Sequence, residues 1–285
     1  PLVFDAEQTG NEPWEPKNYD GKFEGPMRMR QALMKSKNMV SIRILQSISP
    51  EYARDYITKF GFDPTKYPPY LTMALGAGSV TPMQMLAAYS VFANGGFSVE
   101  PYFINRIEDA RGTVLYKATP EVAGNGAKQI IDVRNAYTMV SMLQDVVRHG
   151  TGIRAMQLGR QDLAGKTGTT NDSIDAWFCG FQPTLVGIAW MGYDQPRSLG
   201  DKETGGGAAL PIWMSYMEKA LKDVPEATYN MPDNMVAVHI NEEGYRDDNS
   251  PLVEYFYQEN VPPEHAMPAP NEEIKPADTI KDQLL

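Results

Sequence analysis

Hydrophobic positions early in the chain recur at steps of three and four residues, the spacing of helices that pack on a core. Over residues 27–48 this register is broken by the polar tripeptide Ser36-Lys37-Asn38, so the pattern predicts two helices with a polar junction. Residues 50–61 open with a proline and close with a glycine, which predicts a further short helix. Residues 1–25 show no periodicity and are expected to form an extended surface segment.

Two longer helices are predicted further along the chain. Thr81 can cap the first, Pro82 suits its first turn, and Gln84 stands where a capping-box partner belongs. Gly95 and Gly96 follow the end of this helix. Residues 132–149 repeat the design, with one apolar stripe and a glycine after it. Both helices are predicted to contribute to the core.

The strand-like segments alternate with turn residues. Residues 97–118 alternate in polarity around a central turn, which predicts a hairpin. The runs 162–170, 175–183 and 184–194 are separated by turn residues at hairpin spacing and predict an antiparallel meander. A glycine-rich loop at 203–210 is then followed by a predicted closing helix over 212–224.

The composition changes after Pro225, where proline, asparagine and acidic residues accumulate. We therefore predict one domain over 1–224 and an extension over 225–285 that is partly flexible. The extension has two possible short strands, 236–241 and 252–257. Five prolines between positions 262 and 276 predict a flexible tail.

Composition and charge narrow the function classes. The 285 residues are 42% hydrophobic and 22% charged, close to the average of folded domains. A net charge of −10 without basic runs disfavours a nucleic acid or an anionic membrane as partner. The single cysteine and three scattered histidines give little support to a disulfide framework or a metal site. No apolar run is long enough to span a membrane and no secretory signal is recognisable, so we expect Pro1 to begin a fragment.

One candidate for chemistry is Lys166-Thr167-Gly168-Thr169-Thr170, at the head of a predicted strand. The ammonium and hydroxyl groups could hold a carboxylate, and the glycine would allow the backbone of a ligand to approach closely. Taken alone, the same residues fit an ordinary exposed strand with a solvated lysine.

The second candidate is the pair Ser36 and Asn38, which in isolation would be read as caps between two helices. An S-x-N triplet followed much later by K-T-G gives two of the three motifs of the serine acyl-transfer family. Residues 26–45, 74–97, 162–181 and 209–217 also resemble, in the same order, stretches of class A penicillin-binding proteins of the Gram-negative 1A type. The resemblance extends to about Val224.

This resemblance implies an α/β (α+β) fold, the serine β-lactamase and penicillin-binding transpeptidase fold, with an antiparallel sheet flanked by helices. It implies a peptidoglycan D,D-transpeptidase that acts on stem peptides, binds β-lactams and needs no cofactor. Ser36 would relay a proton and Asn38 would hold the catalytic lysine and the peptide amide. Lys166 and the following residues 167–170 would bind the substrate, and the Thr169 N–H would serve as an oxyanion donor.

The chain departs from the family pattern because no serine stands three positions before any lysine. The S-x-x-K nucleophile motif is therefore expected upstream of Pro1, and this fragment is expected to be inactive by itself. The resemblance further implies an N-terminal glycosyltransferase domain, a membrane anchor, a location on the periplasmic face of the inner membrane, and other cell-wall synthesis proteins as partners.

Other activities stay open at this point. A carboxypeptidase or a β-lactamase of the same superfamily would share both motifs, although the E-x-x-L-N pattern of class A β-lactamases is missing. A non-catalytic module that binds peptidoglycan or acts as a scaffold would share the fold. The retained Ser36, Asn38 and Lys166 argue against such a loss of function.

Overall fold

The computed structural model describes residues 2–9 and 12–264 and divides into two compact units. The first unit combines the chain up to Ser79 with His149–Thr151 and the segment from Asn230 onward. The second contains Val80–Arg148 and Gly152–Tyr229. The mixture of helices with antiparallel sheets in these units agrees with the α+β prediction.

Among the described residues, the first unit contains four α-helices, four 3₁₀ turns and a β-hairpin. The polar junction is found where the sequence predicts it, between α2 (Met29–Met34) and α3 (Asn38–Ile48). The short helix is α4 (Pro50–Ile57), extended by a 3₁₀ turn and closed by Gly61 at φ 86°. The other elements of this part are α1 (Ala6–Thr9), η1 (Thr58–Phe60), η2 (Pro64–Lys66) and η3 (Leu71–Leu75).

The prediction of an extended surface segment over residues 1–25 is wrong for its first part. Phe4 pairs with Trp14 through two backbone hydrogen bonds of 2.9 and 2.8 Å, and their rings are in contact. Phe4 is buried in a cluster with Met39, Ile42 and other apolar residues of the first unit. The gain from burying a large aromatic ring draws the segment onto the core.

The hairpin β8 (Met235–His239) and β9 (Val253–Tyr257) confirms the two strands predicted late in the chain. It is followed by η7 (Gln258–Asn260). This hairpin belongs to the first unit, whereas the predicted domain boundary at residue 225 stays a prediction. The described residues end at residue 264, and the predicted flexible tail lies outside them.

In the second unit, α5 (Pro82–Ala93) begins with the predicted capping box: Thr81 accepts from the Gln84 N–H, and the Gln84 side chain accepts from the Thr81 N–H. The helix α6 (Val133–His149) buries its predicted stripe. The predicted hairpin is formed by β2 (Arg106–Glu108) and β3 (Val114–Lys117), and is exposed along both strands. Two short strands also pair, β1 (Phe97–Ser98) and β4 (Lys128–Gln129).

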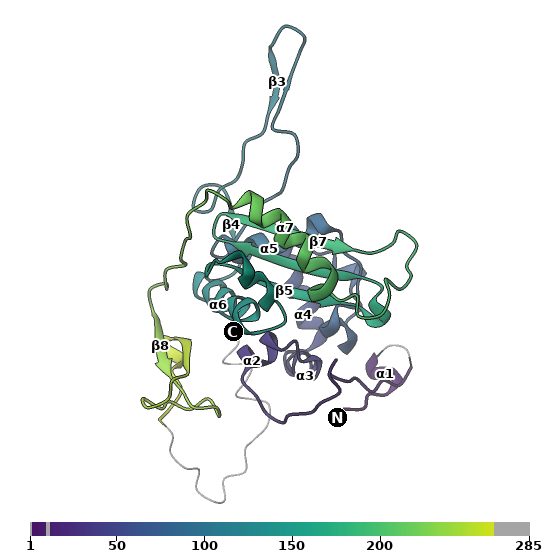
Figure 1. Ribbon diagram of the computed structural model, residues 1–285, viewed down its shortest axis with the longest axis vertical. Helices are drawn as coiled ribbons and strands as arrows, with labels where there is room; N and C mark the ends of the chain where they lie inside the picture. Colours follow the sequence, from purple (N-terminus) through teal and green to yellow (C-terminus); the bar gives the residue numbers. More distant parts are fainter. Residues whose placement is uncertain (1, 10–11, 265–285) are drawn as a thin grey trace, which may run out of the picture. The chain divides into compact units, whose positions relative to one another are not determined.

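The predicted meander is the central sheet of the second unit. It consists of β5 (Ala164–Thr169), β6 (Ala176–Gln182) and β7 (Leu185–Met191), with antiparallel neighbours in the order β5-β6-β7. The helices α5 and α7 (Leu210–Ala220) lie on opposite faces (Figure 1). Tyr89 of α5 contacts Phe181, whereas Trp213 of α7 contacts Phe178, and side chains three positions apart on a strand point to opposite faces.

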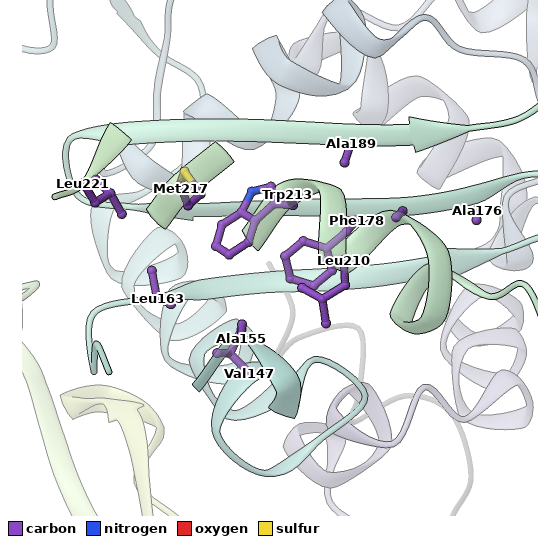
Figure 2. Packing of buried hydrophobic residues seen from close by; sticks show 11 residues of the cluster. Val147, Ala155, Leu163, Ala176, Phe178, Ala189, Leu210, Trp213, Met217 and Leu221 are labelled. Carbon is purple, nitrogen blue, oxygen red and sulfur yellow. The ribbon is translucent and has the colours of Figure 1, made fainter. Parts of the chain in front are cut away.

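The core between α7 and the sheet is built around two aromatic rings. Figure 2 shows Trp213 beside Phe178, with Leu210, Met217 and Leu221 from the same helix region around them. The Trp213 indole N–H lies 3.1 Å from the Gly187 carbonyl oxygen, so its one polar atom is satisfied. This packing fixes α7 along the sheet.

The segment before α7 differs from the sequence prediction. Residues 203–210 were expected to form a glycine-rich loop, but Gly205–Ala209 forms one π-helical turn that runs directly into α7. Thr204 caps this turn by accepting from the Gly207 N–H at 3.0 Å. Together with the hydrogen bond from the Gly205 N–H to Thr169 of β5, this cap offsets the weak helical propensity of three consecutive glycines. Two 3₁₀ turns complete the second unit, η4 (Ile153–Leu158) and η5 (Asn171–Ser173).

Candidate functional site

Ser36 occupies the turn between α2 and α3. Its φ of 53° lies in the left-handed region, which a side chain other than glycine rarely adopts. The Ser36 N–H donates to the Leu33 carbonyl and the Lys37 N–H donates to the Ala32 carbonyl, at 3.1 and 2.9 Å. These two bonds form a Schellman motif, where the left-handed residue is usually glycine. A serine in this conformation carries backbone strain, and such strain is often found at functional sites.

Lys37, the middle residue of the S-x-N triplet, points away from solvent. Its side chain is 3% exposed, and its Nζ lies 2.7 Å from Asp20 Oδ2 and 3.1 Å from Glu24 Oε2. The hydrogen bond to Asp20 raises the pKa of Lys37 above its ordinary value, with a smaller contribution from Glu24. Because the same contacts lower the pKa of both carboxyl groups, all three side chains stay charged near neutral pH.

Asn38 begins α3 and is bound to the N-terminal segment. Its Nδ2 donates to the Lys17 carbonyl at 2.9 Å. One residue further along that segment, the Asn18 side chain accepts from the Met39 N–H at 3.1 Å. Residues 17–24, which we call the strap, thus hold the Ser36–Asn38 turn through Lys17, Asn18, Asp20 and Glu24.

Lys166 lies on β5 opposite Cys179 of β6, in a partly buried position. Its Nζ donates to the Thr167 carbonyl at 3.0 Å, and burial of the ammonium group lowers its pKa to about 8. At neutral pH the group is still largely protonated. It therefore combines a positive charge with incomplete solvation, which favours an anionic ligand.

The cross-strand neighbour Cys179 is buried, and burial raises the pKa of its thiol to about 12. Tyr89 of α5 interacts with this thiol. Cys179 is therefore neutral and packed within the sheet. Together with Tyr89 it supports the sheet behind Lys166.

Gly168 and Thr169 are contacted by the π-helical turn. The Gly205 N–H donates to Thr169 Oγ1 at 3.0 Å. A Cβ added at Gly205 would lie 2.4 Å from the Trp177 carbonyl oxygen and 2.5 Å from that of Gly168. Only a glycine allows the two backbones to lie this close. The backbone of Gly205 therefore packs directly against residues 166–169 of β5 and fixes them on one side.

Thr170 ends the strand and closes the following turn. Its Oγ1 accepts from the Asp175 N–H at 2.7 Å, and its own N–H donates to the Asp175 carbonyl. Within the turn, Asp172 and Ser173 both have positive φ, at 57° and 50°. The Asp175 carboxylate in turn accepts from the Trp190 indole N–H at 2.8 Å. Asp175 thus orders the turn beside the candidate strand.

The structure brings the predicted site residues together in two groups. Ser36 and Asn38 share one turn of the first unit, and residues 166–170 form one strand and its end in the second. Within the part of the chain that the structure describes, no group of three or more His, Cys, Asp or Glu side chains could hold a metal ion. None of the described helices is both long and apolar enough to cross a membrane.

Three supporting groups were not predicted from the sequence: the Asp20–Glu24 carboxylates, Tyr89 and Gly205. The two acidic residues lie in a segment that shows no periodic pattern, and Tyr89 was assigned only to the apolar face of its helix. For Gly205 the sequence did offer a signal, a run of three glycines. A glycine run also marks a place where two backbones come together.

Comparison with known proteins gives consistent matches. The family model of the penicillin binding protein transpeptidase domain matches residues 3–212. Penicillin-binding protein 1A of Neisseria lactamica is 50% identical over 237 residues, which cover 83% of this chain and 30% of that protein. The protein of the same name from Pseudomonas aeruginosa is 45% identical, covering 85% of this chain and 35% of the relative.

A solved structure agrees with these matches. The crystal structure of penicillin-binding protein 1A from Haemophilus influenzae superposes with a TM-score of 0.87 at 34% identity, covering 94% of this chain and 45% of that chain. The chain spans about a third of the length of the curated relatives it matches. Because the family model matches more than half of its residues, the chain belongs to the penicillin-binding protein transpeptidase domain family.

Proposed function

We propose that this chain supplies part of the active site of a peptidoglycan D,D-transpeptidase that is acylated by β-lactams. The observation that carries the proposal is the Lys166–Thr169 strand. It presents a partly desolvated ammonium beside two threonines and a glycine, in the family's K-T-G motif. In the proposed reaction a serine supplied from outside residues 1–285 attacks the carbonyl carbon of a D-Ala-D-Ala amide, and the C–N bond breaks to release D-Ala.

Lys166 is proposed to bind the terminal carboxylate of the stem peptide or the carboxylate of a β-lactam. A charged hydrogen bond in a partly dry site contributes about 1.5–3 kcal/mol. A pKa of about 8 suits this role, because the ammonium is mostly protonated at pH 7 while losing little hydration on binding. Thr167 and Thr169 would add hydroxyl contacts, Gly168 would admit the peptide backbone, and the Thr169 N–H would stabilise the oxyanion.

Ser36 is proposed to relay a proton between the lysine of the nucleophile motif and the departing amine, and Asn38 to hold that lysine and the peptide amide. A proton relay requires a fixed position within hydrogen-bond reach, and does not require a perturbed pKa. The left-handed turn at Ser36 and the strap that binds Lys37 supply such fixation. Both contacts are therefore consistent with a catalytic role for Ser36.

The partners that follow from this activity are peptidoglycan stem peptides and β-lactams. A periplasmic location at the inner membrane, a glycosyltransferase domain in the parent protein and contacts with other cell-wall synthesis proteins belong to the same proposal. They rest on the family and on the named relatives.

The test is covalent labelling by a fluorescent penicillin. We expect the chain of residues 1–285 to remain unlabelled, and the parent protein extended upstream through an S-x-x-K motif to be labelled at the serine of that motif. Mass spectrometry of the labelled peptide identifies the acylated residue. Covalent labelling of residues 1–285 alone would contradict the absence of a nucleophile.

Three further outcomes separate the alternatives. If the protein extended upstream binds peptidoglycan but is not labelled, the alternative of a non-catalytic scaffold module is supported. A labelled protein that only trims the terminal D-Ala, without joining two stem peptides, would be a carboxypeptidase. Rapid hydrolysis of the penicillin would instead indicate a β-lactamase.

A further inference from the structure

The hairpin β8–β9 is joined to the helix that precedes Ser36 by a forked ion pair. Arg30 Nε lies 2.7 Å from Glu254 Oε1, and Arg30 Nη2 lies 2.7 Å from Glu254 Oε2. Arg28 Nη1 reaches the same carboxylate at 3.2 Å. One glutamate of β9 thus receives two guanidinium groups from the start of α2.

These groups are largely removed from water. The side chains of Arg30 and Glu254 are 10% and 14% exposed, and that of Arg28 is 16% exposed. Surface ion pairs contribute little, but removing one partner from a buried pair leaves an uncompensated charge. Glu254 therefore fixes the position of the first turn of α2.

The second step leads from Arg30 to Ser36. The helix α2 has only six residues, and Ala32 and Leu33 provide the carbonyls that accept the Ser36 turn's two hydrogen bonds. The carbonyl of Met34 accepts from the Thr151 N–H at 3.2 Å. The helix is thus held near its start by Glu254 and near its end by Thr151, and the turn at Ser36 follows directly.

We propose that Glu254 is a positioning residue for acylation, and that the hairpin β8–β9 is a structural part of the active site through the Glu254–Arg30 fork. The link rests on the proposed function of Ser36 as a proton relay. A shift of α2 would move the Ser36 hydroxyl with it, because a Schellman turn allows few conformations. Lys166 lies on a different element, so carboxylate binding is expected to be unaffected.

The test is Glu254→Gln in the full-length parent protein, assayed for acylation by penicillin. Glutamine keeps the size and one acceptor oxygen but removes the negative charge that Arg28 and Arg30 share, while Arg28 keeps a longer contact of 3.6 Å with Glu242. General acid–base catalysis contributes about 10²–10⁴-fold to a rate. We expect this variant to lose part of that contribution, so that the acylation rate constant falls about tenfold. The dissociation constant of penicillin is expected to stay unchanged. A variant that merely unfolds would instead lower the fraction of protein that is labelled.

The matched control is Asp248→Asn on the same hairpin. Asp248 also pairs with an arginine, Arg246, at 3.2 Å, but its side chain is 72% exposed. We expect acylation by this variant to equal that of the wild type. Equal losses in both variants would overturn the specific role of Glu254.

A double variant and a second readout complete the test. If Glu254 acts through Ser36, Glu254→Gln has no further effect on the rate in a Ser36→Ala background. Additive losses would contradict the proposal. Hydrogen exchange at the Ser36 and Lys37 amides is expected to accelerate in Glu254→Gln but not in Asp248→Asn. This readout does not depend on enzyme activity, so it separates failure of the positioning link from failure of the proposed function.

Discussion

Lys37 and Lys166 are both withdrawn from solvent, yet their pKa values move in opposite directions. Lys37 lies between Asp20 and Glu24, and these contacts outweigh the effect of burial and raise its pKa. Lys166 lies opposite Cys179 on the neighbouring strand, and burial lowers its pKa to about 8. The same side chain is thus a structural cation in one place, and in the other it is the residue that we propose to bind an anionic ligand.

This contrast separates a supporting residue from a candidate binding residue. A lysine whose charge is already satisfied by carboxylates has little to gain from a substrate anion. A lysine whose ammonium group is poorly solvated gains more, because the ligand supplies interactions that water does not provide there. The two lysines can be exchanged for uncharged residues to test this difference.

The largest effect is expected for Lys166→Met. In the parent protein, acylation by penicillin should fall about 100-fold, which corresponds to the loss of a charged hydrogen bond. The wild type should also lose acylation as the pH rises through about 8, because the ammonium is then deprotonated. Stopped-flow labelling between pH 6 and 9 measures both effects.

The same variant should gain stability. The folded chain binds fewer protons than the unfolded chain between pH 8 and 10.5, so wild-type stability rises with pH across this window. Lys166→Met removes the dependence and should be more stable at pH 7 by about 1–2 kcal/mol, allowing for the exposed part of the side chain. Lys128→Met, at an exposed position of β4, is the control. A lower stability of Lys166→Met at pH 7 would contradict the lowered pKa.

An intermediate effect is expected for Gly205→Ala. The added Cβ would lie within 2.5 Å of the Gly168 carbonyl oxygen, so either the strand or the turn must move. Such overpacking costs about 1–3 kcal/mol. We expect a lower unfolding midpoint in urea and roughly tenfold slower acylation.

The control for this change lies two residues away. At Gly207 the nearest atoms to an added Cβ are 3.2 and 3.3 Å distant, which a small shift relieves. Gly207→Ala should therefore be close to the wild type. Equal behaviour of the two alanine variants would show that the contact between Gly205 and the strand is unimportant.

The smallest effect on acylation, a few-fold, is expected for Lys37→Met, which releases the strap from the Ser36 turn. The pKa values of Asp20 and Glu24 are lowered in the folded state, so the stabilisation is present above about pH 4.5 and lost as the pH falls through the lowered values. The raised pKa of Lys37 keeps this stabilisation intact up to about pH 10. Urea unfolding at pH 3 and pH 7 should show a smaller difference from the wild type at pH 3 than at pH 7.

A matched change is available at Lys35, which is 3.6 Å from the same Glu24 but 40% exposed. Lys35→Met is expected to have a smaller effect than Lys37→Met at pH 7. If the two variants lost the same stability at pH 7, the burial of Lys37 would not explain its contribution to stability.

Local signals in the sequence were sufficient for much of the fold. The capping box at Thr81, the stripe of α6 and the hairpin spacing of β5 to β7 were all predicted correctly, because each depends on neighbours within a few positions. The interpretation failed at Phe4 and at Gly205–Ala209. In both places a contact distant in the sequence, with the core or with β5, overrides the local preference.

The sequence alone therefore determined the element types, the K-T-G and S-x-N motifs and the family. Tertiary structure decided which charges are satisfied and which strands approach each other. Asp20 and Glu24 are 17 and 13 positions from Lys37, and Glu254 is 224 positions from Arg30. Ion pairs of this kind leave no periodic trace in a single sequence, since their energy depends on distance and burial in the folded chain and not on spacing along it.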